Sequence, residues 1–203
     1  MRMTPVSSLA VILLAGCTSE VADVATRSPD AEPLHAAVQN LTDVIVYDIF
    51  SPPQAARAYA YATVAAYEVL RQGDSTFQSL AGQLNDLDPL PLPTADVQIH
   101  FPLAGVHAFM SVGRSLTFSR ARMDTLRADV RMQYMKAGVP EAVADSSVAY
   151  GERVAQHVLA WASKDRFAQT RGYPKYTVTT QGGRWVPTPP AYMDAVEPNW
   201  AKV

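Results

Sequence analysis

Apolar residues recur at helical spacing over most of the chain. Residues 35–50 carry Val, Leu and Ile side chains three and four positions apart, which predicts an amphipathic helix. Residues 52–72 are mostly alanine, aromatic and aliphatic, and a helix that is apolar nearly all round is normally buried on several sides. Ser51 stands at an N-cap position, and the two prolines after it suit the first helical turn. We therefore expect the helix at 52–72 to be the central helix of a bundle.

Three further helices are predicted downstream of a turn-rich link. The link contains Asp88-Pro89-Leu90-Pro91-Leu92-Pro93, which is typical of extended or polyproline-like chain, while residues 77–84 favour a short helical piece. Together these elements predict an all-α fold, a bundle of about five helices over residues 34–166. The further helices are expected at residues 94–118, 119–137 and 140–164, with Pro102 marking either a kink or a later start in the first.

The C-terminal segment, residues 167–203, has no helical pattern. It holds prolines and large aromatic residues without periodicity, although residues 173–180 are compatible with a strand and Gly182-Gly183 with a turn. Such a segment does not build an element of its own. We expect an extended arm that lies on a neighbouring surface and is held there by Trp185, Tyr192 and Trp200.

Length, charge and cysteine content indicate the number of domains and argue against some classes of partner and cross-link. A chain of 203 residues suits one domain with a sizeable core. The formal net charge is −2 and no basic patch stands out, which argues against a nucleic-acid partner. The chain has a single cysteine, Cys17, so no internal disulfide can form.

The first residues are typical of a targeting segment. Arg2 precedes a short apolar run that ends in Leu14-Ala15-Gly16-Cys17, which resembles the lipobox of bacterial lipoproteins. This interpretation gives a signal peptide at residues 1–16, lipid attachment at Cys17 and a tether at residues 17–33. The membrane is then a partner through the lipid, and we expect the protein in the cell envelope, at the outer membrane facing the periplasm or the cell surface. The alternative is an ordinary secretory signal with an incidental cysteine.

Two pairs of residues are candidates for a local site. His100 and His107 are seven positions apart and share a helix face, which makes them weak candidates for a metal or anion site. Without a cysteine or carboxylate at ligand spacing, polar histidines of the core or its rim are the simpler interpretation. Arg57 and Glu68 are the charged residues of the apolar stretch between residues 55 and 70. They either line a cavity or, more simply, form structural bridges to other helices.

Two segments of the chain resemble a known family. One is Asp48-Ile-Phe-Ser-Pro-Pro with Ala56-Arg-Ala-Tyr-Ala-Tyr and Ala66-Tyr-Glu; the other is Lys164-Asp165 with Trp185-Val-Pro-Thr-Pro-Pro-Ala-Tyr and Glu197-Pro-Asn-Trp. Together they resemble the N-terminal half of bacterial lipoproteins in the vanadium-dependent haloperoxidase and type 2 phosphatidic acid phosphatase superfamily. The resemblance implies an all-helical bundle. For a complete member it also implies a catalytic site that binds vanadate or forms a phosphohistidine.

The residues that such a site needs find no match in the chain. The resemblance implies a lysine with an arginine-proline pair, a proline-serine-glycine-histidine run, and a serine-arginine pair with a histidine six residues after the arginine. Leu126 stands where the pair Ser119-Arg120 would require that histidine, and Gly172 follows Arg171 in place of proline. We therefore expect no catalytic residue and no cofactor in these residues. Vanadate is implied only for the complete family member.

Two functions remain open from the sequence. The first is the N-terminal helical scaffold of a haloperoxidase-like or acid-phosphatase-like lipoprotein, inactive alone, whose partner is a missing C-terminal catalytic half or another chain. The second is a self-sufficient, lipid-anchored helical binding module without catalysis. The first predicts a large exposed apolar face, whereas the second predicts a closed core with the arm docked on its own surface.

Overall fold

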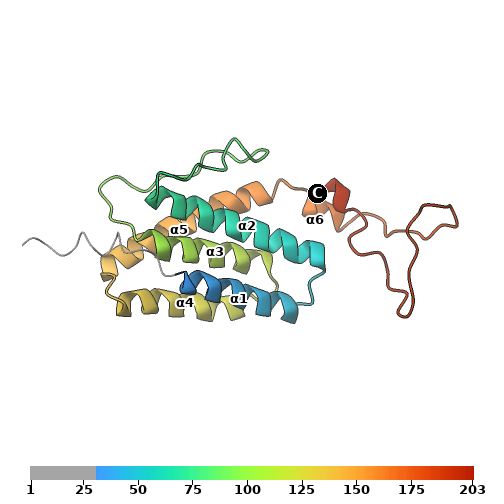
Figure 1. The fold of residues 1–203 in the computed structure, drawn as a ribbon, viewed down its shortest axis with the longest axis horizontal. Helices are drawn as coiled ribbons and strands as arrows, with labels where there is room; N and C mark the ends of the chain where they lie inside the picture. Colours follow the sequence, from blue (N-terminus) through green and yellow to red (C-terminus); the bar gives the residue numbers. More distant parts are fainter. Residues whose placement is uncertain (1–30) are drawn as a thin grey trace, which may run out of the picture.

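The computed structural model describes residues 31–203 and is built from helices (Figure 1). Over these residues there is no β-sheet, and the isolated bridge between Ala81 and Leu84 is the single strand-like pairing. The all-α prediction is therefore confirmed. The elements are α1 (Glu32–Tyr47), α2 (Pro52–Leu70), the 3-10 turn η2 (Arg71–Gly73), α3 (Phe101–Leu116), α4 (Arg120–Lys136), α5 (Glu141–Ala162), the short α6 (Phe167–Thr170) and the 3-10 turn η3 (Trp200–Lys202).

The centre of the bundle is α3. Every residue from Leu103 to Gly113 is buried, because α3 lies between α2 and α5 on one side and α1 and α4 on the other (Figure 1). Helix α2 packs along α3 and α5, but it leaves Ala56, Ala60 and Thr63 exposed. The expectation that α2 is the central helix is therefore wrong. Its alanine-rich composition gives it a second apolar face, which residues 31–203 do not cover.

Helices α3 and α5 cross with their backbones almost in contact. A Cβ atom placed on Gly151 of α5 would lie 2.4 Å from the carbonyl oxygen of Ala104 on α3. Glycine is needed here, because any side chain would push the two backbones apart. Tyr150 beside it is fully buried and packs edge-on against Phe101. This crossing fixes α3 and α5 relative to each other, and Ser111 of α3 is hydrogen-bonded to Glu152 of α5.

The start of α3 differs from the sequence-based expectation. The helix expected from residue 94 begins at Phe101, and Pro102 occupies its first turn. The N-cap residue is His100, whose Nδ1 accepts the Leu103 N–H at 3.2 Å. Pro102 thus marks a later start, because a proline in the first turn costs no hydrogen bond.

Two short elements expected from the sequence do not form. Residues 77–84 form turns, because a carboxylate on α2 binds their backbone, and residues 173–180 form no strand. The helices expected at 119–137 and 140–164 are confirmed as α4 and α5, with ends that differ by at most two residues.

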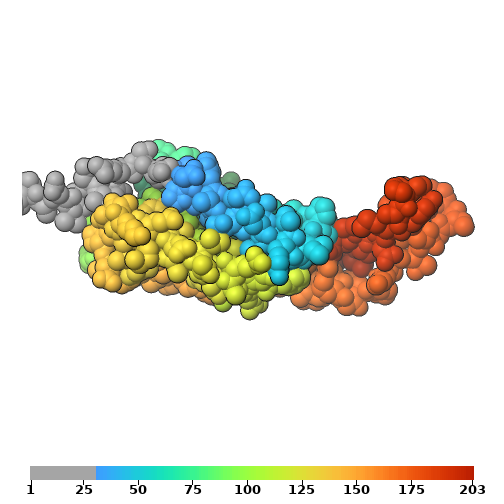
Figure 2. Space-filling view, turned by 90° about the horizontal axis from the view of Figure 1, so that it is seen from below, coloured from blue at the N-terminus to red at the C-terminus, as the bar shows by residue number. Residues whose placement is uncertain are grey.

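The C-terminal arm, residues 171–199, projects from the end of the bundle. It runs outward and returns, so that it forms a separate lobe in both views (Figures 1 and 2). Trp200 packs against Phe167 of α6 at the base of the arm. Trp185 instead contacts a tyrosine within the arm, and Tyr192 is 62% exposed. The expectation of three anchors on a neighbouring surface therefore holds for Trp200 and is wrong for the other two.

The predicted signal peptide (1–16) and the lipid attachment site Cys17 lie outside the described residues. Helix α1 begins at Glu32 with a proline in its first turn, so it includes the end of the segment 17–33 that was expected to be a tether. Among residues 31–203, no helix has both the length and the hydropathy needed to cross a membrane.

Candidate functional site

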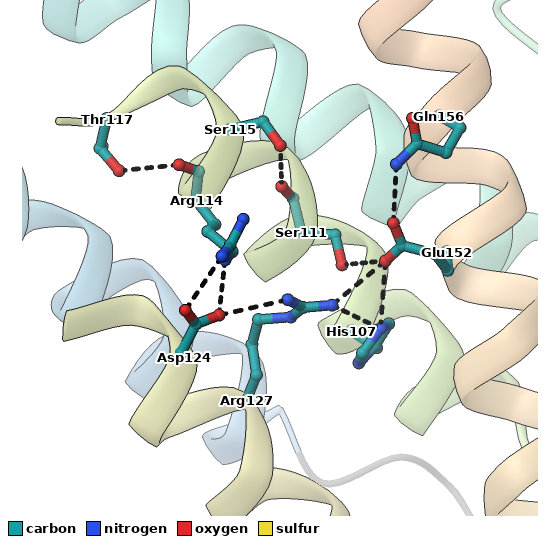
Figure 3. A network of polar contacts seen from close by, with 9 residues as sticks. All are labelled: His107, Ser111, Arg114, Ser115, Thr117, Asp124, Arg127, Glu152 and Gln156. Atoms are coloured by element: carbon teal, nitrogen blue, oxygen red, sulfur yellow. Dashed lines mark hydrogen bonds and ion pairs between the residues drawn. The ribbon is translucent and has the colours of Figure 1, made fainter. Parts of the chain in front are cut away.

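A cluster of charged side chains lies between α3, α4 and α5 (Figure 3). Glu152 of α5 accepts hydrogen bonds from the Ser111 hydroxyl at 2.9 Å and from Arg127 Nη2 at 3.1 Å. The same Arg127 nitrogen lies 3.2 Å from Nε2 of His107 on α3. Three helices are thus tied together by one arginine and one carboxylate.

The cluster continues along α4 with a second arginine-carboxylate pair. Arg114 of α3 donates to both carboxylate oxygens of Asp124, at 2.5 and 3.0 Å. Asp124 also lies 3.5 Å from Arg127, so two guanidinium groups face two carboxylates. An oxyanion such as vanadate needs cationic donors that are free to bind it. Both arginines are already paired, so this cluster does not fit a vanadate site.

Burial and neighbouring polar groups set the pKa values of His107 and Glu152 in this cluster. It lowers the pKa of His107 to about 4, and the charge of Arg127 acts in the same direction. His107 is therefore neutral at pH 7 and accepts the arginine N–H. Burial raises the pKa of Glu152, but the hydrogen bonds from Gln156 and Ser111 together with the electrostatic effects of Arg127 and His107 outweigh it, so that pKa lies below its ordinary value.

The low pKa of His107 predicts a loss of stability in acid. The pKa is 6.5 for a free imidazole and about 4 in the fold, so the unfolded chain binds more protons between these values. The contribution of His107 alone to the free energy of unfolding should therefore fall by about 3 kcal/mol as the pH drops from 7 to 4. Urea titrations at several pH values measure this slope, and His107→Gln should flatten it. The control is His35→Gln on the exposed face of α1, and an equal change of slope in both variants would contradict the assignment.

The two candidate metal-binding histidines serve different structural roles. His100 caps α3 and packs edge-on against Tyr134, and burial lowers its pKa, whereas His107 belongs to the charged cluster. Within residues 31–203, no group of three or more His, Cys, Asp or Glu side chains is placed to hold a metal ion.

Arg57 connects α2 to the base of the arm. Its Nε donates to Asp165 at 2.6 Å, and its Nη2 donates to the Ala162 carbonyl at the end of α5. The guanidinium also lies against the rings of Tyr61 and Phe167, 5.0 and 4.6 Å from their centres. Burial and the Asp165 hydrogen bond raise the pKa of Tyr61 to about 12, so its hydroxyl remains a donor to that carboxylate.

Glu68 connects α2 to the link before α3. Its side chain is fully buried, and it accepts hydrogen bonds from the Leu80 N–H at 2.5 Å, from Ser79 and from Arg71 Nε at 2.8 Å. Arg57 and Glu68 thus bind different partners, and both are bridges between elements. Arg57 and Asp165 also line a groove.

This groove, the α2 groove, has a volume of about 1100 Å³ and follows the uncovered face of α2. It includes the exposed residues Ala56, Ala60 and Thr63, and most of its other side chains are aromatic or aliphatic. The lining comes from α2, the link, α5 with the turn after it, and the C-terminal turn: Ala56, Arg57, Tyr59, Ala60, Tyr61, Thr63, Val64, Tyr67, Leu80, Leu84, Trp161, Asp165, Trp200 and Val203.

A solved structure resembles most of the chain. It is described as the crystal structure of the first bacterial vanadium-dependent iodoperoxidase, and it shares 43% sequence identity with a TM-score of 0.79. The similarity covers 87% of this chain. The chain belongs to the vanadium-dependent haloperoxidase superfamily. It matches no model of a protein family and no curated protein.

This member of the haloperoxidase superfamily spans 43% of the iodoperoxidase chain, which is less than half of its length. The 43% identity over most of this chain confirms the sequence-based resemblance to that superfamily. Lys164 and Arg171 have the lysine-to-arginine spacing that the resemblance implies, but they bind different carboxylates. Lys164 lies 3.8 Å from Asp88, whereas Arg171 pairs with Glu197 in the arm.

Three acidic residues that organise this haloperoxidase-family chain had no role assigned from the sequence. Asp165 holds Arg57, and Glu197 binds Arg171 and the Ser51 hydroxyl at the base of the arm. Asp48 accepts the N–H groups of residues 118 and 119 and so ties the end of α1 to the turn that precedes α4. All three lie in the segments that carry the family resemblance. Their presence in those segments was the one feature of the sequence that could have marked them as important.

Proposed function

We propose that this chain is the N-terminal helical scaffold of a vanadium haloperoxidase-type protein. In this proposal the residues that bind the oxyanion belong to polypeptide outside these 203 residues, and the chain alone does not catalyse. The observation that carries it is the 43% identity to an iodoperoxidase of which the chain covers less than half. Vanadate would be held by that other polypeptide, where it would supply the electrophilic centre for halide oxidation.

Two structural features support the scaffold over a self-sufficient binding module. The arm projects from the bundle instead of docking on it (Figure 2). Val186, Tyr192 and Met193 in the arm are exposed. The α2 groove leaves an apolar face uncovered, as expected for a missing partner. A module that was complete in itself would cover both.

We also propose that the scaffold is held at the membrane through a lipid on Cys17. The sequence Leu14-Ala15-Gly16-Cys17 supports this, and acyl chains that bury many methylenes give stable anchoring. In a bacterial host, Cys17→Ser should move the protein from the membrane fraction to the soluble periplasmic fraction. If wild type and variant fractionate alike, Cys17 carries no anchor.

The catalytic part of the proposal is tested with the purified chain. With orthovanadate, hydrogen peroxide and iodide it should show no iodide oxidation above the vanadate blank, because both cluster arginines are paired and no motif histidine is present. The iodoperoxidase is the positive control. Joining the chain to the part of the iodoperoxidase that follows the region of similarity should restore vanadate-dependent oxidation. Vanadate-dependent turnover by the chain alone would contradict the proposal.

A further inference from the structure

We propose that the α2 groove is the docking site for an apolar helix face of the polypeptide that corresponds to the uncovered part of the iodoperoxidase. This inference rests on the proposed function and adds to it the surface on which the two parts meet. The groove is open, so it would not enclose a small ligand as a binding pocket does. A helix laid along α2 would cover it.

The shape of the groove suits a helix. Ala56, Ala60 and Thr63 lie on one face of α2 at the spacing of successive helical turns, and all three are exposed. Small residues allow a second helix to approach at the short end of the usual interaxial range, about 8 Å. Tyr59 and Val64 flank this stripe, so they would pack on either side of the incoming helix.

Most polar side chains of the groove are hydrogen-bonded or paired within the chain. The hydroxyl of Tyr59 is bonded to Thr42 at 2.7 Å, and the hydroxyl of Tyr67 donates to a carbonyl in the link. The indole N–H of Trp161 likewise donates to a carbonyl of the link at 2.9 Å. Arg57 pairs with Asp165, the other charged lining residue. These rings therefore offer apolar faces, and the groove offers no unpaired charge, so the matching surface is apolar.

The occupant follows from the comparison and from the position of Val203. More than half of the iodoperoxidase chain has no counterpart in this one. Trp200 and Val203 both line the α2 groove, so polypeptide joined to Val203 would enter it directly. A second copy of this chain is the competing occupant, and it would have to bring an apolar helix face of its own.

The test uses the 203-residue chain joined at Val203 to the part of the iodoperoxidase that follows the region of similarity. In this chimaera Ala60→Arg places a cation in the groove, and the matched control Ala128→Arg places one on the exposed face of α4. Proteolysis of the iodoperoxidase part should be roughly tenfold faster or more with Ala60→Arg, because cleavage reports the population of the undocked state. The control should equal the wild-type chimaera. In the 203-residue chain alone, both variants should melt like wild type.

Three results would overturn the docking proposal: equal protease resistance of the two variants, an iodoperoxidase part that stays protease-sensitive in the wild-type chimaera, or a dimer of the 203-residue chain that Ala60→Arg dissociates. A protease-resistant wild-type chimaera that Ala60→Arg destabilises, but that shows no vanadate-dependent iodide oxidation, would support docking and contradict the proposed function. The two proposals therefore fail in distinguishable ways.

Discussion

Glu68→Ala is expected to destabilise the fold by about 3–5 kcal/mol, the range found when one partner of a buried charge pair is removed. The carboxylate has no exposed surface, and it compensates Arg71 while accepting the Leu80 N–H and the Ser79 hydroxyl. Alanine leaves a mostly buried guanidinium and a backbone N–H without their acceptor. Urea unfolding followed by circular dichroism measures the loss, which is a large part of the stability of a typical domain.

Two variants show whether burial causes the effect. Glu68→Gln keeps an oxygen that can accept the Leu80 N–H but removes the charge that faces Arg71, so its cost should be intermediate. Glu141→Ala removes a carboxylate that is 74% exposed and that pairs with Arg131 at 3.6 Å, and it should cost less than about 1 kcal/mol. If Glu68→Ala cost no more than Glu141→Ala, the buried bridge would not stabilise the fold.

Periodicity predicted the long helices well because each one carries its own signal. The ends of α4 and α5 follow from local residues such as Gly138, which has a left-handed backbone just after α4. Burial was less predictable, since it depends on the neighbours of each helix. Helix α2 was expected at the centre because it is rich in alanine and aromatic residues, but α3 is the more apolar of the two and occupies that place, and its close approach to α5 depends on Gly151. The local sequences of α3 and α5 do not predict where these two helices cross.

The partners of the charged residues were harder still to predict. Glu68 stood out as a charge in an apolar helix, but its acceptor role joins it to a link without regular structure. Asp48, in the turn after α1, accepts the N–H of Ser119, which lies 71 positions later in the sequence. Such contacts join segments that are distant in sequence, and a single sequence gives no information about which distant segments meet.

Arg57→Ala is the second change with a large expected effect, and it should act mainly on the base of the arm. Arg57 and Asp165 are 12% and 13% exposed, so the pair is largely buried, and its removal leaves the carboxylate with the Tyr61 hydroxyl and the Phe167 N–H as donors. We expect a loss of about 3 kcal/mol or more in the free energy of unfolding. Hydrogen exchange of the amides in α6 and in residues 197–203 should also accelerate, because the guanidinium no longer packs against Phe167.

Arg57→Lys separates the charge from the shape of this side chain. Lysine keeps the cation, but it lacks the planar fork that donates to Asp165 and Ala162 while stacking between two rings. It should therefore recover only part of the loss. Arg120→Ala, on an exposed position of α4, is the matched control and should be close to neutral. Unchanged exchange in α6 and at 197–203 in Arg57→Ala would show that the arm is held without this arginine. The α2 groove would then keep its C-terminal wall, because Trp200 and Val203 would stay in place without the Arg57–Asp165 pair.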